Sequence, residues 1–87
     1  MFVILCYDVG AKRIARVMKT VKKYLRPVQH SVFDGHISEK NLQALKAELK
    51  PLIEPENDGI IIYRCGWGGK IITETIGRHR SEEKYIL

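Results

Sequence analysis

The sequence predicts an α+β fold in which two helices cover one face of a largely antiparallel sheet. Apolar runs rich in Val, Ile and Tyr, which favour buried strands, occupy residues 2–9 and 59–65. Between these runs lie two segments whose apolar residues recur at helical spacing, one beginning at Lys12 and one following Ser38. A further strand-like stretch, residues 28–37, separates the two helical segments. Strands that alternate with two amphipathic helices are typical of a two-layer sandwich.

The first predicted strand has the sequence FVILCYDV, an apolar run in which Asp8 is the first charged residue. After a short break at residues 9–11, the apolar period changes to that of one helical stripe. This stripe consists of Ile14, Val17, Met18, Val21 and Leu25. Pro27 is expected to end the helix, because proline disfavours helical geometry at the preceding Arg26.

The middle of the chain contains the strand-like stretch and the second helix. Residues 28–37, VQHSVFDGHI, carry Asp34-Gly35 as a turn or a bulge, so the pattern leaves open one bent strand or two short strands. Ser38 is a suitable N-cap for the second helix, and Pro51 is expected to limit it near its end. The apolar stripe of this helix consists of Leu42, Leu45, Leu49, Leu52 and Ile53.

The last part of the chain predicts a hairpin. Residues 55–59, PENDG, form a loop before the strand at residues 59–65, GIIIYRC. Residues 66–69, GWGG, turn the chain, and residues 70–76, KIITETI, are expected to pair antiparallel with that strand. The resulting order, β-α-β(β)-α-β-β, is that of the ferredoxin-like fold.

Length and composition limit the classes of protein. The 87 residues suffice for one ferredoxin-like domain over residues 1–87, with about residues 78–87 as a C-terminal extension, and oligomerisation would supplement its modest core. No run of roughly 18 apolar residues predicts a membrane span, and the start lacks the basic region of a signal peptide, so the expected location is the cytoplasm. Cys6 and Cys65 are too few for a disulfide scaffold or a zinc site. They are interpreted as buried thiols, with a redox or ligand role as the alternative.

The charge is unevenly distributed. The formal net charge is +5, from 15 Lys and Arg against 10 Asp and Glu, yet no acid falls between Asp8 and Asp34. The bases in this interval are Lys12, Arg13, Arg16, Lys19, Lys22, Lys23 and Arg26. A basic helix is often only a solvated face, but exposed helices normally mix both signs. The acid-free run therefore favours a surface for phosphates, with Arg78 and Arg80 as the alternative location.

The chain combines YDV at the end of the first strand, a basic first helix, the segment VQHSVFDG and a following Leu-rich helix. This combination resembles the CRISPR-associated adaptation proteins of the second Cas (Cas-two) family, and it spans residues 2 to about 77. The resemblance implies a ferredoxin-like fold, a symmetric homodimer with its sheets packed together, and Mg²⁺-dependent endonuclease cleavage of RNA or double-stranded DNA. It also implies a role in antiviral defense, as the adaptor that bridges two dimers of the first Cas protein, the integrase, during spacer capture. Catalysis is not required for the adaptor role in every member.

The resemblance also assigns site residues. Asp8 is implied as the Mg²⁺ ligand and catalytic residue, with Tyr7, Ser31 and Phe33 beside it. The resemblance implies Arg13, Arg16 and Arg26 as residues of the cleft, and the acid-free run adds Lys19, Lys22 and Lys23 to the predicted nucleic-acid-binding residues. Carboxylate oxygens suit Mg²⁺, which prefers hard ligands and can activate water for attack on a phosphodiester. From spacing alone, Asp8 is also typical of a helix N-cap or a turn former, and Phe33 of a core or dimer-interface residue.

A single carboxylate provides few ligands for a divalent metal ion. A twofold interface brings the same residue from both chains together, so we expect Asp8 and its symmetry mate to face one cleft and share one metal ion. Two other functions stay open: a non-catalytic scaffold that bridges nucleic acid in the same complex, and a toxin-like ribonuclease of related fold. Trp67, in its Gly-rich turn, is expected to pack at the turn or in an interface, with stacking on a base as the alternative.

Overall fold

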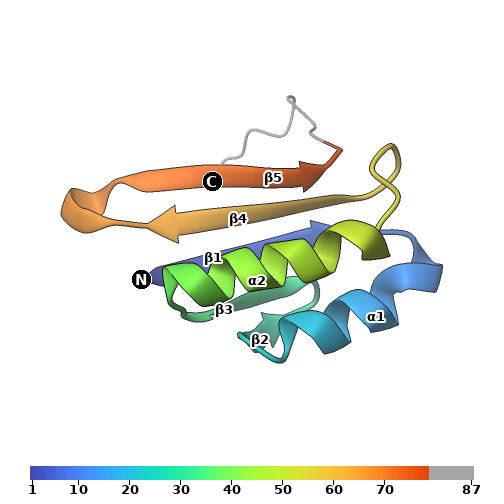
Figure 1. The fold of residues 1–87 in the computed structure, drawn as a ribbon, viewed down its shortest axis with the longest axis horizontal. Helices are drawn as coiled ribbons and strands as arrows, with labels where there is room; N and C mark the ends of the chain where they lie inside the picture. The colour runs from blue at the N-terminus through green and yellow to red at the C-terminus, as the bar shows by residue number, and fades with distance from the viewer. Residues whose placement is uncertain (79–87) are drawn as a thin grey trace.

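The computed structural model describes residues 1–78, which contain a sheet and two α-helices (Figure 1). The elements are β1 (Phe2–Asp8), α1 (Ala11–Val21), β2 (Arg26–Gln29), β3 (Val32–His36), α2 (Glu39–Leu49), β4 (Gly59–Cys65) and β5 (Ile71–Gly77). Two short 3₁₀ helices, η1 (Lys50–Leu52) and η2 (Trp67–Gly69), lie before and after β4. Residues 79–87, with Arg80 and the apolar end at Tyr85, Ile86 and Leu87, fall outside the described part of the chain.

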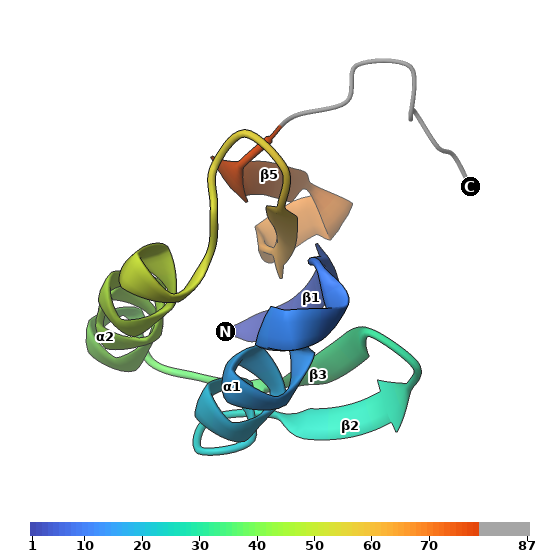
Figure 2. The same ribbon diagram turned by 90° about the vertical axis from the view of Figure 1, so that its right-hand side faces the viewer.

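The described strands form one antiparallel sheet in the order β2-β3-β1-β4-β5. Both helices lie on the same face of this sheet, as Figure 2 shows in the view along the strands. The arrangement confirms the predicted α+β sandwich of the ferredoxin-like type. No helix within residues 1–78 is long and apolar enough to cross a membrane.

The burial of alternate residues in the central strand β1 identifies the two faces of the sheet. Val3, Leu5 and Tyr7 are buried in the core beneath the helices, whereas Asp8 is exposed. Successive residues of a strand point to opposite faces, so Asp8 lies on the face that the helices leave uncovered, called the open face below. At this end of the sheet Asp8 is paired with Gly59 of β4.

The stretch that was predicted as one bent strand or two short ones is a hairpin of two strands. The chain turns at His30 and Ser31, where Ser31 adopts a positive φ of 62°. The interpretation of Asp34-Gly35 as a turn or bulge is wrong, because both residues pair in register with β1. The irregularity lies in β2 instead, opposite Phe33 and Val32, where proline cannot donate a ladder hydrogen bond.

The first helix is shorter than its apolar stripe predicts. It ends at Val21, and the next four residues form turns in which the Leu25 N–H donates to the Val21 carbonyl oxygen at 2.9 Å. Leu25 stays in the core although it lies outside the helix. Pro27 therefore lies within β2 and is not the residue that ends the helix.

The second helix follows its prediction closely. The Ser38 hydroxyl accepts a hydrogen bond from the Asn41 N–H at 3.1 Å, which confirms the N-cap. Of its predicted stripe, Leu42, Leu45 and Leu49 lie in α2 and are fully buried, whereas Leu52 and Ile53 lie beyond the end of the helix, in and after η1.

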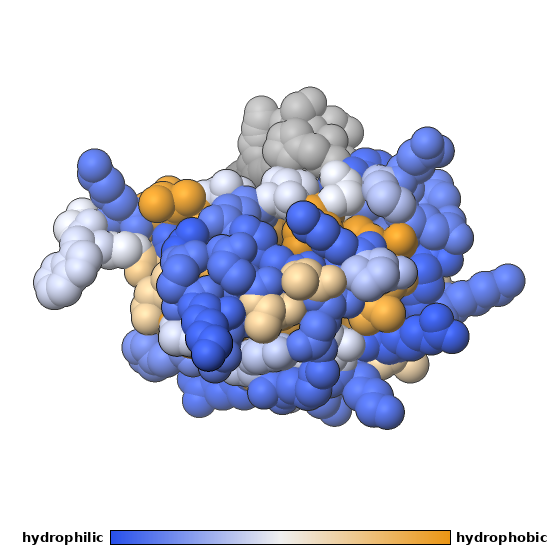
Figure 3. Space-filling model, in the orientation of Figure 1, coloured by the Kyte–Doolittle hydropathy of each residue, from blue (hydrophilic) through white to orange (hydrophobic). Residues whose placement is uncertain are grey.

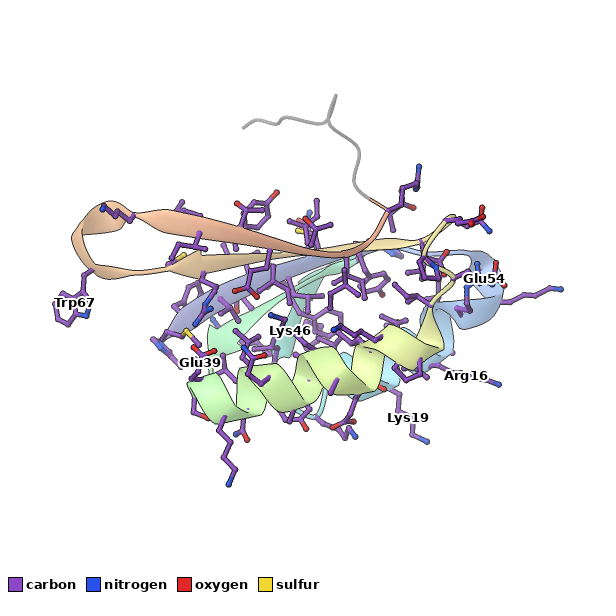
Figure 4. All side chains as sticks on the ribbon, turned by 45° about the horizontal axis from the view of Figure 1, so that its top comes forward. Arg16, Lys19, Glu39, Lys46, Glu54 and Trp67 are labelled. Atoms are coloured by element: carbon purple, nitrogen blue, oxygen red, sulfur yellow. The ribbon has the colours of Figure 1, made fainter. Side chains whose placement is uncertain are left out.

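Polar contacts join the second helix to β4 and β5. The Lys46 ammonium donates to one Glu74 oxygen at 2.6 Å, and Arg64 donates to the other at 2.7 Å and to Glu39. Lys46 and then Arg64 hold the pKa of the Glu74 carboxyl below its usual value. These bases are therefore committed to the fold (Figure 4 labels Lys46 and Glu39).

Asp58, one of the two acids of the predicted PENDG loop, is completely buried. One carboxylate oxygen accepts from the Gly10 N–H at 2.9 Å and from Arg13 Nη2 at 3.0 Å. The other accepts from the Glu54 N–H at 2.9 Å and from Arg13 Nε at 2.5 Å. The Arg13 guanidinium first, and then the two backbone N–H groups, hold the pKa of Asp58 well below its usual range, although burial raises it.

The backbone of Asp58 extends this network to the end of the sheet. Its carbonyl oxygen accepts from the Arg78 N–H at 2.7 Å. A side chain at Gly77 would place its Cβ 2.4 Å from that same oxygen, so the close approach requires glycine. Asp58 thus fixes the loop after β1, the first turn of α1 and the residue after β5 relative to one another.

Replacing Asp58 with alanine should lower the free energy of unfolding by about 3 kcal/mol, because Arg13 then keeps a partly buried charge without its main partner. Denaturant titration at neutral pH measures the change. Glu56→Ala is the control, since Glu56 is an exposed acid of the same loop and should change stability by about 0.5 kcal/mol or less. A loss for Asp58→Ala no larger than that of the control would contradict the role given to Asp58.

Stability should also fall in acid, and Asp58 should account for part of the fall. Its pKa is depressed in the folded chain, so below about pH 4 the unfolded chain binds a proton that the folded chain does not. The contribution of Asp58 is therefore present above about pH 4 and is lost as the pH decreases further. Unfolding free energies measured from pH 7 to pH 3 should decrease less in Asp58→Asn than in the unmodified protein. Parallel curves would contradict this assignment.

Candidate functional site

Asp8 is the last residue of β1 and its side chain is 71% exposed on the open face. Gly59 and Gly77 are paired at the same end of the neighbouring strands, which brings the following Arg78 beside it. Arg78 Nη2 lies 3.5 Å from Asp8 Oδ2. The carboxylate at the predicted catalytic position thus has a guanidinium next to it, a neighbour that the sequence pattern did not indicate because β1 and β5 are far apart in the chain.

The donor set at Asp8 meets only part of what Mg²⁺ requires. A carboxylate is the right chemistry, because Mg²⁺ prefers oxygen ligands. Within residues 1–78, however, no group of three or more His, Cys, Asp or Glu residues could hold a metal ion. The Arg78 charge would also repel a cation placed at Asp8. The described part of one chain therefore offers at most one half of a divalent-metal site.

The other predicted catalytic residues lie on the opposite side of the sheet. Tyr7 and Phe33 are buried on the helix side, with ring centroids 6.2 Å apart, and the Tyr7 N–H donates to the Ser31 carbonyl oxygen at 3.1 Å. The three residues line one cavity of about 340 Å³ between α1 and the β2–β3 hairpin. Its other lining residues are Ile14, Met18, Pro27, Gln29 and His30. The structure therefore brings Tyr7, Ser31 and Phe33 together but separates them from the Asp8 carboxylate by the thickness of the sheet.

Some of the predicted nucleic-acid-binding residues form ion pairs within the fold. Arg13 binds Asp58, as described above. Lys23 pairs with Glu48 of α2, whose other oxygen accepts from the Tyr24 hydroxyl at 2.6 Å, and these two donors lower the pKa of Glu48. Arg26 Nε donates to Asp34 of β3 at 2.9 Å. The run that is acid-free in sequence is thus partly neutralised in space by acids of other elements.

The remaining bases of the run form an exposed surface, called the α1 basic surface below. It consists of Lys12, Arg16, Lys19 and Lys22. Among residues 1–78, no carboxylate forms an ion pair with any of them. Figure 4 shows Arg16 and Lys19 pointing outward from the helix layer, and the view of that layer in Figure 3 is largely hydrophilic. The α1 basic surface therefore lies on the helix layer, whereas Asp8 lies on the open face.

Trp67 is 97% exposed at the turn between β4 and β5. The expectation that it packs at the turn is wrong, because the side chain is almost completely exposed in η2, between Gly66 and Gly68. In Figure 4 it projects from the end of the hairpin. Interface burial and stacking stay open for this residue.

Cys6 and Cys65 are half-buried residues of the open face. Burial raises the pKa of the Cys6 thiol, which keeps it protonated and unreactive at neutral pH.

Comparison with known proteins supports the resemblance on which the site residues rest. The family model described as CRISPR associated protein Cas2 matches residues 1–68. The chain is 36% identical to a CRISPR-associated endoribonuclease Cas2 of Thermotoga maritima and 43% identical to one of Dictyoglomus turgidum. Both alignments cover 100% of this chain and 100% of the relative.

Solved structures agree with the sequence comparison. A crystal structure of Cas2 has a TM-score of 0.72 and 36% identity, and the alignment covers 100% of this chain and 98% of that one. Streptococcus pyogenes Cas2, solved at pH 6.5, has a TM-score of 0.70 and 30% identity, over 78% of this chain and 89% of that one. Since the matches in sequence and in fold extend over most or all of its length, the chain belongs to the CRISPR-associated Cas2 family.

Proposed function

We propose that this chain is a CRISPR-associated endoribonuclease whose cleavage centre is built around Asp8. The observation that carries the proposal is the position of Asp8, an exposed carboxylate at the rim of the open face with a guanidinium beside it. The curated relatives are named as endoribonucleases, which favours RNA as the substrate. Double-stranded DNA is the second candidate substrate.

The proposed active form is a symmetric homodimer in which two open faces pack together. The open face presents apolar side chains between the strand ends, and Ile71 of β5 is 61% exposed. Its apolar members include Phe2, Ile4, Cys6, Val32, Ile61 and Cys65. Contiguous apolar surface of this kind is typical of an interface, and an isologous contact would place the two Asp8 carboxylates at one boundary. The second chain would then supply the carboxylate that one chain lacks.

Mg²⁺ is the proposed cofactor of this composite site. When bound, it would supply the charge that polarises a phosphodiester and a water nucleophile at neutral pH. The part played by the chain itself is to hold Asp8 at the end of β1, where the Asp58 network fixes the adjoining loop.

A second candidate function is that of a scaffold that bridges nucleic acid between integrase dimers. The separation of the α1 basic surface from Asp8 favours it, because nucleic acid that lies along the helix layer does not reach the carboxylate of the same chain. A dimer would present two such surfaces, one on each outer side. The two functions are compatible, since they use opposite sides of the sheet.

Charge reversal on the α1 basic surface should weaken nucleic-acid binding. The double variant Lys19→Glu and Lys22→Glu loses phosphate contacts, so the slope of log K against log salt concentration should decrease in magnitude by about 1.4 to 1.8. Filter binding or fluorescence anisotropy with RNA in the presence of a chelator measures it. Lys23→Gln should have a smaller effect than Lys22→Gln, because Lys23 is paired with Glu48.

The matched control for this experiment is Lys40→Glu with Lys70→Glu. Both lysines are exposed, one at the start of α2 and one at the β4–β5 turn, and the variant changes the net charge equally. If the control loses as much affinity as the α1 variant, then binding follows net charge alone and the α1 basic surface is not the binding site.

Asp8→Ala should reduce Mg²⁺-dependent cleavage of labelled RNA roughly a hundredfold or more, because the site then loses its carboxylate. Heterodimers with one unmodified chain and one Asp8→Ala chain distinguish a shared site from two separate sites. Activity near that of the Asp8→Ala homodimer is expected for a shared site. Heterodimers that keep half or more of the activity per dimer would show that each chain has a site of its own. Full activity of the Asp8→Ala homodimer would refute the cleavage centre altogether.

A further inference from the structure

We propose that Arg78 is a counter-ion of Asp8 before substrate binds, and that its guanidinium moves from the carboxylate to a phosphate oxygen of the nucleic acid during the reaction. The inference rests on the proposed function of Asp8 and adds to it a residue that the resemblance does not assign.

The first observation is that the pair is loose. Arg78 Nη2 and Asp8 Oδ2 are 3.5 Å apart, whereas charge-assisted hydrogen bonds between such groups are about 2.7 to 2.9 Å long. The Asp8 side chain is largely exposed, so water screens the attraction. An ion pair with this geometry can be exchanged for another partner at a small cost in free energy.

The second observation is an unsatisfied donor. Arg78 Nε is buried and has no hydrogen-bond acceptor within residues 1–78. By contrast, Arg13 directs both Nε and Nη2 to Asp58. A buried N–H without an acceptor costs free energy, so a side-chain rotation that brings this N–H to an external acceptor gains more at Arg78 than at a satisfied arginine. The fork of a guanidinium matches two phosphate oxygens, which makes a phosphodiester the fitting acceptor.

The third observation is that the backbone of Arg78 is fixed while its side chain is partly exposed. Its N–H donates to Asp58, and a Cβ at Gly59 would lie 2.5 Å from the Arg78 carbonyl oxygen, so the main chain is tightly enclosed. The guanidinium can therefore change partner by side-chain rotation alone. Because the main chain does not move, the guanidinium remains within reach of any phosphate that approaches the carboxylate.

This geometry implies that Arg78 and a divalent cation compete for the Asp8 carboxylate. While Arg78 neutralises Asp8, its charge opposes the approach of a divalent cation to the same oxygens. A phosphate that binds Arg78 removes this opposition. Nucleic acid and divalent cation should therefore bind more tightly together than separately.

The test measures cation affinity without activity. Mn²⁺ serves as the probe, titrated into the full-length protein without nucleic acid and followed by electron paramagnetic resonance. Arg78→Gln should bind Mn²⁺ roughly threefold to fivefold more tightly than the unmodified protein, the ratio expected for removing one exposed ion pair. Arg78→Lys, which keeps the charge, should remain near the unmodified value. A purely structural role of Arg78 would weaken cation binding or leave it unchanged.

RNA affinity in chelator gives the second readout. Arg78→Gln should lower the magnitude of the salt slope by about 0.7 to 0.9, which corresponds to one phosphate contact. The matched control is Lys70→Gln, the same charge change at the opposite end of the β4–β5 hairpin. It should leave the Mn²⁺ affinity unchanged.

The possible outcomes distinguish a failure of the proposed role of Arg78 from a failure of the proposed endoribonuclease function. If Asp8→Asn abolishes Mn²⁺ binding but Arg78→Gln behaves as Lys70→Gln does, the role of Arg78 is refuted and the site at Asp8 stands. If neither the unmodified protein nor Arg78→Gln binds Mn²⁺ better than Asp8→Asn does, the competition is refuted too. Cleavage that does not require Asp8 refutes the proposed function itself.

Discussion

The buried carboxylate of Asp58 is the interaction on which the arrangement of this chain depends. Its oxygens accept from the loop after β1, from Arg13 of α1 and from the loop before β4, and its main-chain carbonyl accepts from Arg78. These are the segments that surround the end of β1. A domain of this size has little core with which to position groups at its rim. The charge-assisted hydrogen bonds of the Asp58 carboxylate compensate for this small core, and they determine where Asp8 and Arg78 lie.

The structural features that could be predicted from the sequence are those that depend on residues close together in the chain. The leucine stripe of α2 and the Ser38 cap depend on residues three or four apart, and both are as expected. The end of α1 and the turn at His30 and Ser31 were missed, because the pairing of β2 and β3 beside the central strand decides them. The loop pattern does not indicate that Asp58 is buried, since its donors include Gly10 and Arg13, which lie far away along the chain.

The candidate site shows the same limit. The run between Asp8 and Asp34 contains no acid, but three of its bases meet acids supplied by α2, β3 and the loop before β4. Only the subset on the outer side of α1 stays available for phosphates. The neighbourhood of Asp8 and Arg78 likewise arises from strand pairing alone. Charge patterns along a chain therefore indicate how many cations exist, whereas the fold decides which of them remain uncommitted.

Tyr7 and Asp8 are consecutive residues, yet one side chain lies in the dry interior and the other in water. A strand has a period of two, so a slip of β1 by a single residue would drive the carboxylate under the helices and the phenol ring out to solvent. The length of the first strand is consequently as much a part of the site as any side chain in it. Inserting or deleting one residue between Phe2 and Asp8 would destroy core and site together, even if every residue type were kept.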